Sequence, residues 1–123
     1  RDYYGLTAFM LACKFGHKDV VQLLLDHSDR NIELNARNNC EFTAFMLACK
    51  FGHKDVVQLL LDYSGRIELN ARDRFGSTAF MSACIQREKE VVQLLLEHSK
   101  DKDTNIPENH ISSKMIKDFI DTL

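Results

Sequence analysis

The sequence has little of several features that mark other classes of protein. Its 123 residues include one proline and no tryptophan, from which no function follows. It has no basic excess, because 16 Lys and Arg stand against 18 Asp and Glu, whereas a nucleic-acid-binding domain usually carries surplus positive charge. No apolar run approaches the roughly 20 residues that a membrane-spanning helix needs. These absences argue against nucleic acid as a partner and against insertion into a membrane.

A secretory leader is also missing. The chain begins with Arg1, and no charged segment followed by an apolar one comes after it. We therefore expect the sequence to be a processed product or a part of a longer chain. Its length fits one domain or one array of repeats. Its 45% apolar and 28% charged residues are ordinary for a globular domain.

The motifs of the common enzyme classes are missing too. The sequence has no glycine-rich dinucleotide fingerprint, no phosphate-binding loop and no H-E-x-x-H metalloprotease motif. The nucleophile motif G-x-S-x-G is absent as well. Its carboxylates are spread along expected helix ends and connectors, as on solvated faces. We therefore predict no enzymatic activity, no cofactor and no small-molecule substrate.

What the sequence does contain is one segment three times. TAFMLACKFGHKDVVQLLLD runs from Thr7 to Asp26 and again from Thr43 to Asp62, and the two copies are identical over all 20 residues. A third copy, TAFMSACIQREKEVVQLLLE, runs from Thr78 to Glu97. The starting threonines are 36 and then 35 residues apart. A period of this length is typical of helical solenoids and not of compact enzyme cores.

Each repeat predicts two helices. Thr7 is a good N-cap for a short helix over Ala8–Lys14, and Gly16 ends it because glycine adopts left-handed backbone angles at little cost. A second helix is expected over Lys18–His27, and residues 32–42 read as an extended, turn-rich connector. The apolar face of the second helix comprises Val20, Val21, Leu23, Leu24 and Leu25.

These motifs resemble the ankyrin repeat. The family's D-x-x-G-x-T turn is present at 2–7 and 73–78, its G-H turn at 16–17 and 52–53, and its V-V-x-L-L-L helix starts at Val20, Val56 and Val91. The resemblance covers residue 1 to about residue 100. It implies an all-α solenoid of helix-turn-helix units joined by extended β-turn or hairpin loops. The expected repeats are about 2–37, 38–72 and 73–105.

The sequence departs from the family pattern in each repeat. Ala and Met replace the Pro and His of the family's T-P-L-H, so apolar packing by Met10, Met46 and Met81 should replace a histidine hydrogen bond. Glu41 and Arg87 stand where the family has glycine. If these two keep left-handed angles, each adds strain on the order of 1 kcal/mol.

The two ends of the array are expected to differ. Residues 113–123 read as one amphipathic helix that Ser112 or Ser113 can cap, so a C-terminal capping helix is predicted over about 112–123, with a partner-binding helix as the alternative. Its removal should expose the face of Leu94–Leu96. The chain starts inside a turn, so the first repeat should present an open face.

The cysteines read as structural residues. Cys13, Cys49 and Cys84 share one register of successive repeats, and equivalent atoms of stacked repeats lie too far apart for a disulfide. We expect them to be small buried groups in a reducing compartment, which favours an intracellular protein. Cys40 lies near a turn tip, where we expect it to be exposed and to be the most reactive thiol.

The cysteines and histidines together give a weak indication of a zinc site. Cys-x-x-x-His occurs at 13–17 and 49–53, which resembles a zinc set of two Cys and two His. The spacing follows from the duplication, however, and the cysteines should face the core. We therefore predict no metal, and we expect His17 and His53 to bridge backbone groups of neighbouring repeats. His27, His98 and His110 read as surface residues.

The resemblance implies binding of another protein or peptide through the turn tips and the concave inner-helix face. Mapped onto this sequence, that surface is rich in aromatic and cationic side chains and has no acidic one, so an acidic partner with apolar anchors is expected. Packing within the solenoid is the alternative role for its aromatics, above all the two phenylalanines that follow the first helices. A spacer, or a regulatory segment of a larger enzyme or channel, is the alternative function. The predicted contacts are Tyr3, Tyr4, Leu6, Lys14, Phe15, Arg37, Asn39, Cys40, Phe42, Lys50, Phe51, Arg72, Arg74, Phe75, Ser77, Ile85 and Gln86.

Overall fold

The computed structural model describes residues 4–27, 33–63 and 65–102, with side chains up to residue 98. The predicted C-terminal capping helix and Tyr3 lie outside these residues. Within the described residues the regular secondary structure is entirely helical, as predicted. The helices are α1 (Ala8–Lys14), α2 (Lys18–Asp26), α3 (Ala44–Lys50), α4 (Lys54–Asp62), α5 (Ala79–Ile85) and α6 (Lys89–Lys102).

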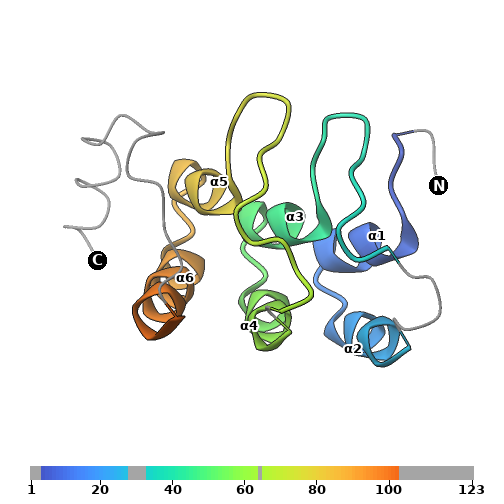
Figure 1. Cartoon of the computed structure of the whole chain (residues 1–123), viewed down its shortest axis with the longest axis horizontal. Helices are drawn as coiled ribbons and strands as arrows, with labels where there is room; N and C mark the ends of the chain where they lie inside the picture. The colour runs from blue at the N-terminus through green and yellow to red at the C-terminus, as the bar shows by residue number, and fades with distance from the viewer. Residues whose placement is uncertain (1–3, 28–32, 64, 103–123) are drawn as a thin grey trace.

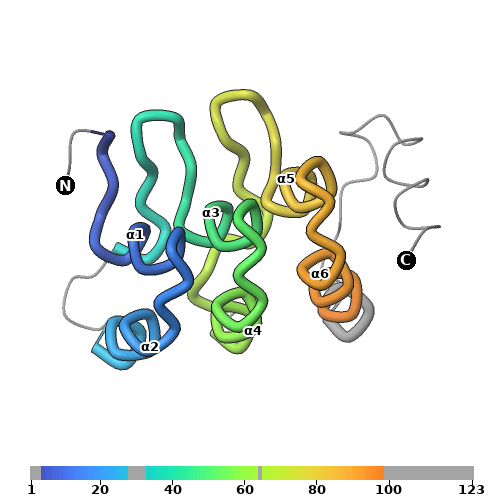
Figure 2. The backbone as a smooth tube through the Cα atoms, turned by 180° about the vertical axis from the view of Figure 1, so that it is seen from behind, coloured from blue at the N-terminus to red at the C-terminus, as the bar shows by residue number. Residues whose placement is uncertain are grey.

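The helices form two layers. The first helices of the repeats, α1, α3 and α5, pack side by side as an inner layer, and α2, α4 and α6 form an outer layer, which is the lower row in Figure 1. The same two rows are seen from the opposite side in Figure 2. Residues 33–43 and 65–78 connect each outer helix to the next inner helix, and they rise as long loops beyond the inner layer. We call these loops, with residues 4–7 of the first repeat, the fingers.

Each inner helix begins at a threonine cap. The hydroxyls of Thr7, Thr43 and Thr78 accept the backbone N–H of the methionine three residues further on, at 3.1 to 3.3 Å. In the second and third repeats the cap is reciprocal, because the backbone N–H of each threonine donates to the sulfur of Met46 or Met81 at 3.4 Å. The expectation of apolar packing alone was therefore incomplete. Methionine sulfur also takes over the role of hydrogen-bond acceptor.

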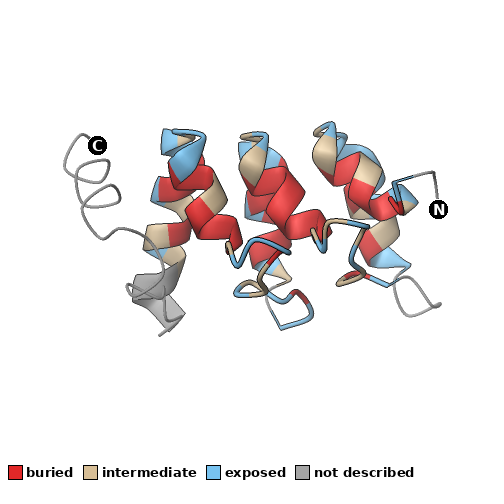
Figure 3. Cartoon of the chain, turned by 90° about the horizontal axis from the view of Figure 1, so that it is seen from above, coloured by how far each residue is buried: buried red, intermediate tan, exposed pale blue. Residues whose placement is uncertain are grey.

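The core lies where the two layers meet, and the buried residues line the packed sides of the helices (Figure 3). Cys13, Cys49 and Cys84 are buried there as free thiols, as predicted. Burial raises the pKa of Cys13 to about 12 and that of Cys84 to about 11, because the thiolate would lose its hydration. The pKa of Cys49 is raised for the same reason, with a smaller contribution from nearby Cys13.

The first repeat leaves part of its outer helix uncovered. Leu23 is 57% exposed, whereas Leu59, the same residue of the identical second copy, is 7% exposed. Val20 and Val56 differ in the same way. The predicted apolar face of α2 is thus only partly buried, because α2 packs against α4 and no described element packs on its other side. Within the described residues, this side of the first repeat is exposed.

The turns between inner and outer helices bring neighbouring repeats into contact. At Gly16 (φ 72°) an added β-carbon would lie 2.5 Å from Nδ1 of His53. The Nε2 atom of His53 lies 2.6 Å from the carbonyl oxygen of Lys14, so the predicted bridge between repeats is confirmed for this histidine. His17 is exposed, and its ring lies 6.4 Å from the ring of Phe15. His53 bridges back to the preceding repeat, so the equivalent bridge from His17 stays a prediction.

Two residues other than glycine hold left-handed backbone angles. Glu41 has φ 63° and Arg87 has φ 58°, at the positions where the other repeats carry glycine. The expected conformation is confirmed at both. Each β-carbon is held against the backbone, which costs about 1 kcal/mol.

Candidate functional site

The second and third fingers are each shaped by one side chain at the start of the turn. In the second finger, Oδ1 of Asn38 accepts the backbone N–H groups of Cys40 and Phe42, at 3.0 and 2.9 Å. In the third, Oδ1 of the buried Asp73 accepts those of Phe75 and Ser77, at 2.8 and 3.0 Å. Asn and Asp favour such turns because their short side chains reach the backbone two residues on. The turn leaves Phe75 78% exposed at the tip.

Neighbouring fingers are joined by their main chains. The backbone N–H of Asn39 donates to the carbonyl of Tyr4, and that of Arg74 donates to the carbonyl of Cys40, both at 3.1 Å. One such bond per pair holds the tips in register along the array. Tyr4, Cys40 and Phe75 are equivalent residues and therefore lie in one line across the tips.

The arginines of the fingers donate hydrogen bonds to backbone carbonyl groups. A guanidinium N–H of Arg37 donates to the carbonyl of Arg72, and one of Arg74 donates to the carbonyl of Asn39, so each ties one finger to the next. Arg72 donates to the carbonyl of Gly76 within its own finger at 3.0 Å. The sequence predicted these arginines as partner contacts and did not reveal their bonds to the backbone.

Lysine and phenylalanine side chains form a row along the inner helices. Lys14 Nζ lies 5.4 Å from the ring centre of Phe15 and 5.7 Å from that of Phe51. Lys50 Nζ lies 5.8 Å from Phe51 and 5.0 Å from Phe42. Phe51 therefore lies between two ammonium groups, at the distance of cation–π contacts. We call these five residues the Lys–Phe row.

The row crosses the exposed side of the inner layer. Phe42 precedes α3 and Lys50 ends it, so their contact spans the length of that helix. Phe15 and Phe51 are 58% and 45% exposed. The row and the equivalent residues of the third repeat, Ile85 and Gln86, together form what we call the inner face.

Most of the predicted contacts reach the surface, in two groups. The first group is exposed: Tyr4, Phe15, Arg37, Asn39, Phe51, Arg74, Phe75, Ile85 and Gln86. The second is half-buried: Lys14, Cys40, Phe42, Lys50, Arg72 and Ser77. The exposure of Phe15 and Phe51 argues against a role as packing alone.

Two expectations about this surface are wrong. Leu6 belongs to the core, since it is 6% exposed, and it is not a surface contact. Cys40 is half-buried and not exposed, because the Asn38 side chain and the neighbouring Arg74 backbone hold its main chain between two fingers.

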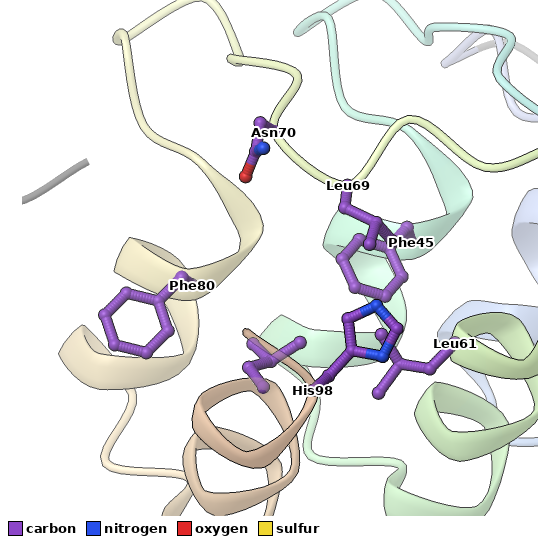
Figure 4. Close-up of a pocket in the computed structure, with 7 residues that line it drawn as sticks. Phe45, Leu61, Leu69, Asn70, Phe80 and His98 are labelled. Atoms are coloured by element: carbon purple, nitrogen blue, oxygen red, sulfur yellow. The ribbon is translucent and has the colours of Figure 1, made fainter. Parts of the chain in front are cut away.

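A small pocket lies between the second and third repeats, away from the finger tips. Its lining residues are Phe45, Leu61, Leu69, Asn70, Phe80, Leu95 and His98 (Figure 4). His98 stands where the preceding interface has Tyr63. The Tyr63 hydroxyl donates to Asp26 at 3.3 Å and accepts from Gln22 at 3.2 Å. The pocket therefore marks a less completely packed interface, lined by one half-buried histidine that was expected at the surface.

The Cys and His residues of the duplicated segment do not converge. Cys13 is fully buried while His17 is exposed, and His53 lies against the carbonyl of Lys14. Across the residues with a described placement, no group of three or more His, Cys, Asp or Glu could hold a metal ion. Among the same residues, no helix is both long and apolar enough to cross a membrane.

The stacked helix pairs, the protruding fingers and the near-constant repeat length define a helical-repeat solenoid. A family model of ankyrin repeats, in three copies, matches residues 9–108. The chain therefore belongs to the ankyrin repeat family, as its motifs predicted. Ankyrin repeats generally serve as protein-interaction modules, and the family is typically non-catalytic. Comparison with curated proteins gave no match.

Proposed function

We propose that this chain is a non-enzymatic module that binds a partner protein through the finger tips and the inner face. The supporting observation is the exposure of two rings of the Lys–Phe row, Phe15 and Phe51. Phe9 and Phe45 show what packing alone produces, since each is 2% exposed. Phe15 and Phe51 keep about half of their surface in contact with solvent at a defined position beside lysines. Exposed aromatic groups held in place are typical binding hot spots.

The proposed partner has apolar anchors and acidic flanks. The predicted contacts carry five cationic side chains and no carboxylate, although the whole chain has a net charge of −2. Anchors would pack on the rings, while carboxylates would pair with lysines and steer association. Glu41 is exposed at the edge of this surface and opposes such a partner. Four free cysteines support the proposal of a reducing, intracellular setting.

The test uses two double variants of the same duplicated segment. Phe15→Ala/Phe51→Ala removes the exposed rings of the inner face. Lys18→Ala/Lys54→Ala is the matched control, since both lysines are exposed on the outer helices α2 and α4. Proteins captured by the wild-type chain are identified, and the affinity of each purified partner for all three chains is measured by calorimetry.

We expect the ring variant to lose at least about tenfold in affinity, because a hot-spot truncation costs more than about 1 kcal/mol. The control should change affinity less than about twofold. Circular dichroism of each variant verifies that the helices are retained. A partner that binds the ring variant as well as the wild type, or that depends on Lys18 and Lys54, would contradict the proposed binding face.

A further inference from the structure

We propose that the ligand of the inner face is a peptide segment with one acidic and one uncharged apolar end, bound in a single orientation. The acidic end lies over the first two repeats, and the apolar end lies over the third. This inference rests on the proposed function and adds the polarity of the ligand. The polarity is inferred from differences in charge and exposure between repeats that are otherwise nearly identical.

Positive charge is confined to two of the three equivalent positions. Lys14 and Lys50 end α1 and α3, whereas Ile85 ends α5. Ile85 is an exposed apolar side chain, and Gln86 replaces the phenylalanine that follows in the other repeats. The inner face therefore changes from cationic and aromatic to neutral and aliphatic along the array.

The turn after α5 reinforces this change. Glu88 occupies the position of His53, and its carboxylate packs against Gly52 as His53 packs against Gly16. A negative charge therefore lies at the boundary of the second and third repeats. Arg87 beside it balances this charge, so the turn after α5 offers no net attraction to an acidic segment.

The Lys–Phe row selects the sign of the ligand's charge. Both lysine ammonium groups already lie over ring faces, between 5.0 and 5.8 Å from the ring centres. A cationic ligand would meet occupied rings and two like charges. An ammonium group has three N–H donors, so a lysine over a ring can still bind a carboxylate. Acidic side chains therefore fit this part of the face and basic ones do not.

The finger arginines favour an acidic ligand but do not follow the charge difference of the inner face, because two of the three lie on the third finger. Arg37 lies on the second finger, while Arg72 and Arg74 lie on the third, and all three guanidinium groups are bonded to backbone carbonyls. Exposed Glu41 on the second finger offsets part of this charge. Orientation is therefore set at the helix ends, where the lysines and Ile85 differ.

The test starts from a displayed library of random peptides of about 12 residues, long enough to cross three helices spaced roughly 8–10 Å apart. The tightest peptide is synthesised and titrated into the wild type, Lys14→Gln/Lys50→Gln and the matched control Lys18→Gln/Lys54→Gln. A nitroxide label is then placed on its acidic or its apolar end, and broadening of backbone amide resonances is measured by NMR. A 12-residue oligothymidine is titrated as the nucleic-acid comparison.

We expect Lys14→Gln/Lys50→Gln to weaken peptide binding about tenfold, since each substitution removes one ion pair with the acidic end, and the control to change it less than about twofold. The label on the acidic end should broaden the amides of residues 14–17, and the label on the apolar end those of 85–87. This pattern would support the proposal.

Three results would overturn it. Peptides that need Phe15 and Phe51 but bind in both orientations, or without the lysines, would contradict the polarity and leave the proposed function standing. Peptides that shift only outer-helix resonances, or a library that yields no binder, would contradict both. Tighter binding of the oligothymidine than of any peptide, lost in Lys14→Gln/Lys50→Gln, would assign the face to single-stranded nucleic acid.

Discussion

At the scale of single residues, Glu41 replaces the glycine of the family pattern, and its left-handed backbone angle lowers stability. The equivalent residues of the other two repeats are Gly5 and Gly76, both with positive φ, so the finger turn needs this angle whatever side chain it carries. The backbone N–H of Glu41 donates to the carbonyl of Asn38 at 2.9 Å. A glycine could make the same bond without the strain that a β-carbon causes.

We therefore predict that Glu41→Gly raises the free energy of unfolding by about 0.5–1 kcal/mol, measured by urea denaturation. The control Glu41→Ala removes the carboxylate but keeps the β-carbon, so it should give no comparable gain. If Glu41→Ala stabilises as much as Glu41→Gly, charge repulsion and not backbone strain explains the effect. Both variants should also bind an acidic partner slightly more tightly.

Residue identity predicted some features of the site and missed others. The left-handed turns, the threonine caps and the bridge made by His53 follow from local pattern and were found. The burial of Leu6 and the sharing of Phe51 between two lysines depend on neighbouring repeats. A single repeat contains no information on those contacts, because they form between segments about 36 residues apart.

At the scale of elements, α2 and α4 separate the effect of sequence from the effect of position. Their sequences are identical, yet only α4 has described outer helices packed on both sides, α2 and α6. The apolar pattern correctly predicted helices and the side that faces the core. It could not predict that Val20 and Leu23 are exposed among the described residues, because exposure depends on which helices pack on each side of α2.

Leu59→Ala and Leu23→Ala test this difference with the same substitution in the same local sequence. We expect Leu59→Ala to cost about 2–4 kcal/mol, since it leaves a cavity in the packed stack. Leu23→Ala should cost less than about 1 kcal/mol, because much of the side chain is already in water. Urea unfolding measures both values. Equal losses would mean that the first repeat is covered as completely as the second.

A substitution at the interface between the second and third repeats should stabilise the fold. Gln58 Nε2 donates to Oδ1 of Asp62 at 3.3 Å. The equivalent pair one repeat earlier, Gln22 and Asp26, binds the Tyr63 hydroxyl. His98→Tyr would place a phenol at the equivalent site and fill part of the pocket. We predict a gain of about 1 kcal/mol in the free energy of unfolding.

The control for this gain is His98→Phe, which fills the pocket without a hydroxyl and should give a smaller one. Thermal unfolding of both variants beside the wild type measures the difference. A Tyr variant no more stable than the Phe variant would show that the hydroxyl does not join the Gln58–Asp62 pair.

At the scale of the whole molecule, a short helical array supports a surface that no single repeat contains. Main-chain bonds between fingers hold the tips in line, and the Lys–Phe row joins the first two repeats. The sequence predicted the solenoid and most of the exposed residues. It did not predict the change from Lys–Phe to Ile–Gln as a feature of one continuous face, since that requires the three repeats to be stacked.

The central claim is that a partner binds the inner face and finger tips. NMR titration with a partner or selected peptide tests it most directly, because it distinguishes residues of the two identical segments. We predict that amide resonances of residues 14–16, 50–52 and 85–86 shift together with those of Tyr4 and Phe75. Shifts confined to 18–26 and 54–62, on the outer helices, would contradict the account.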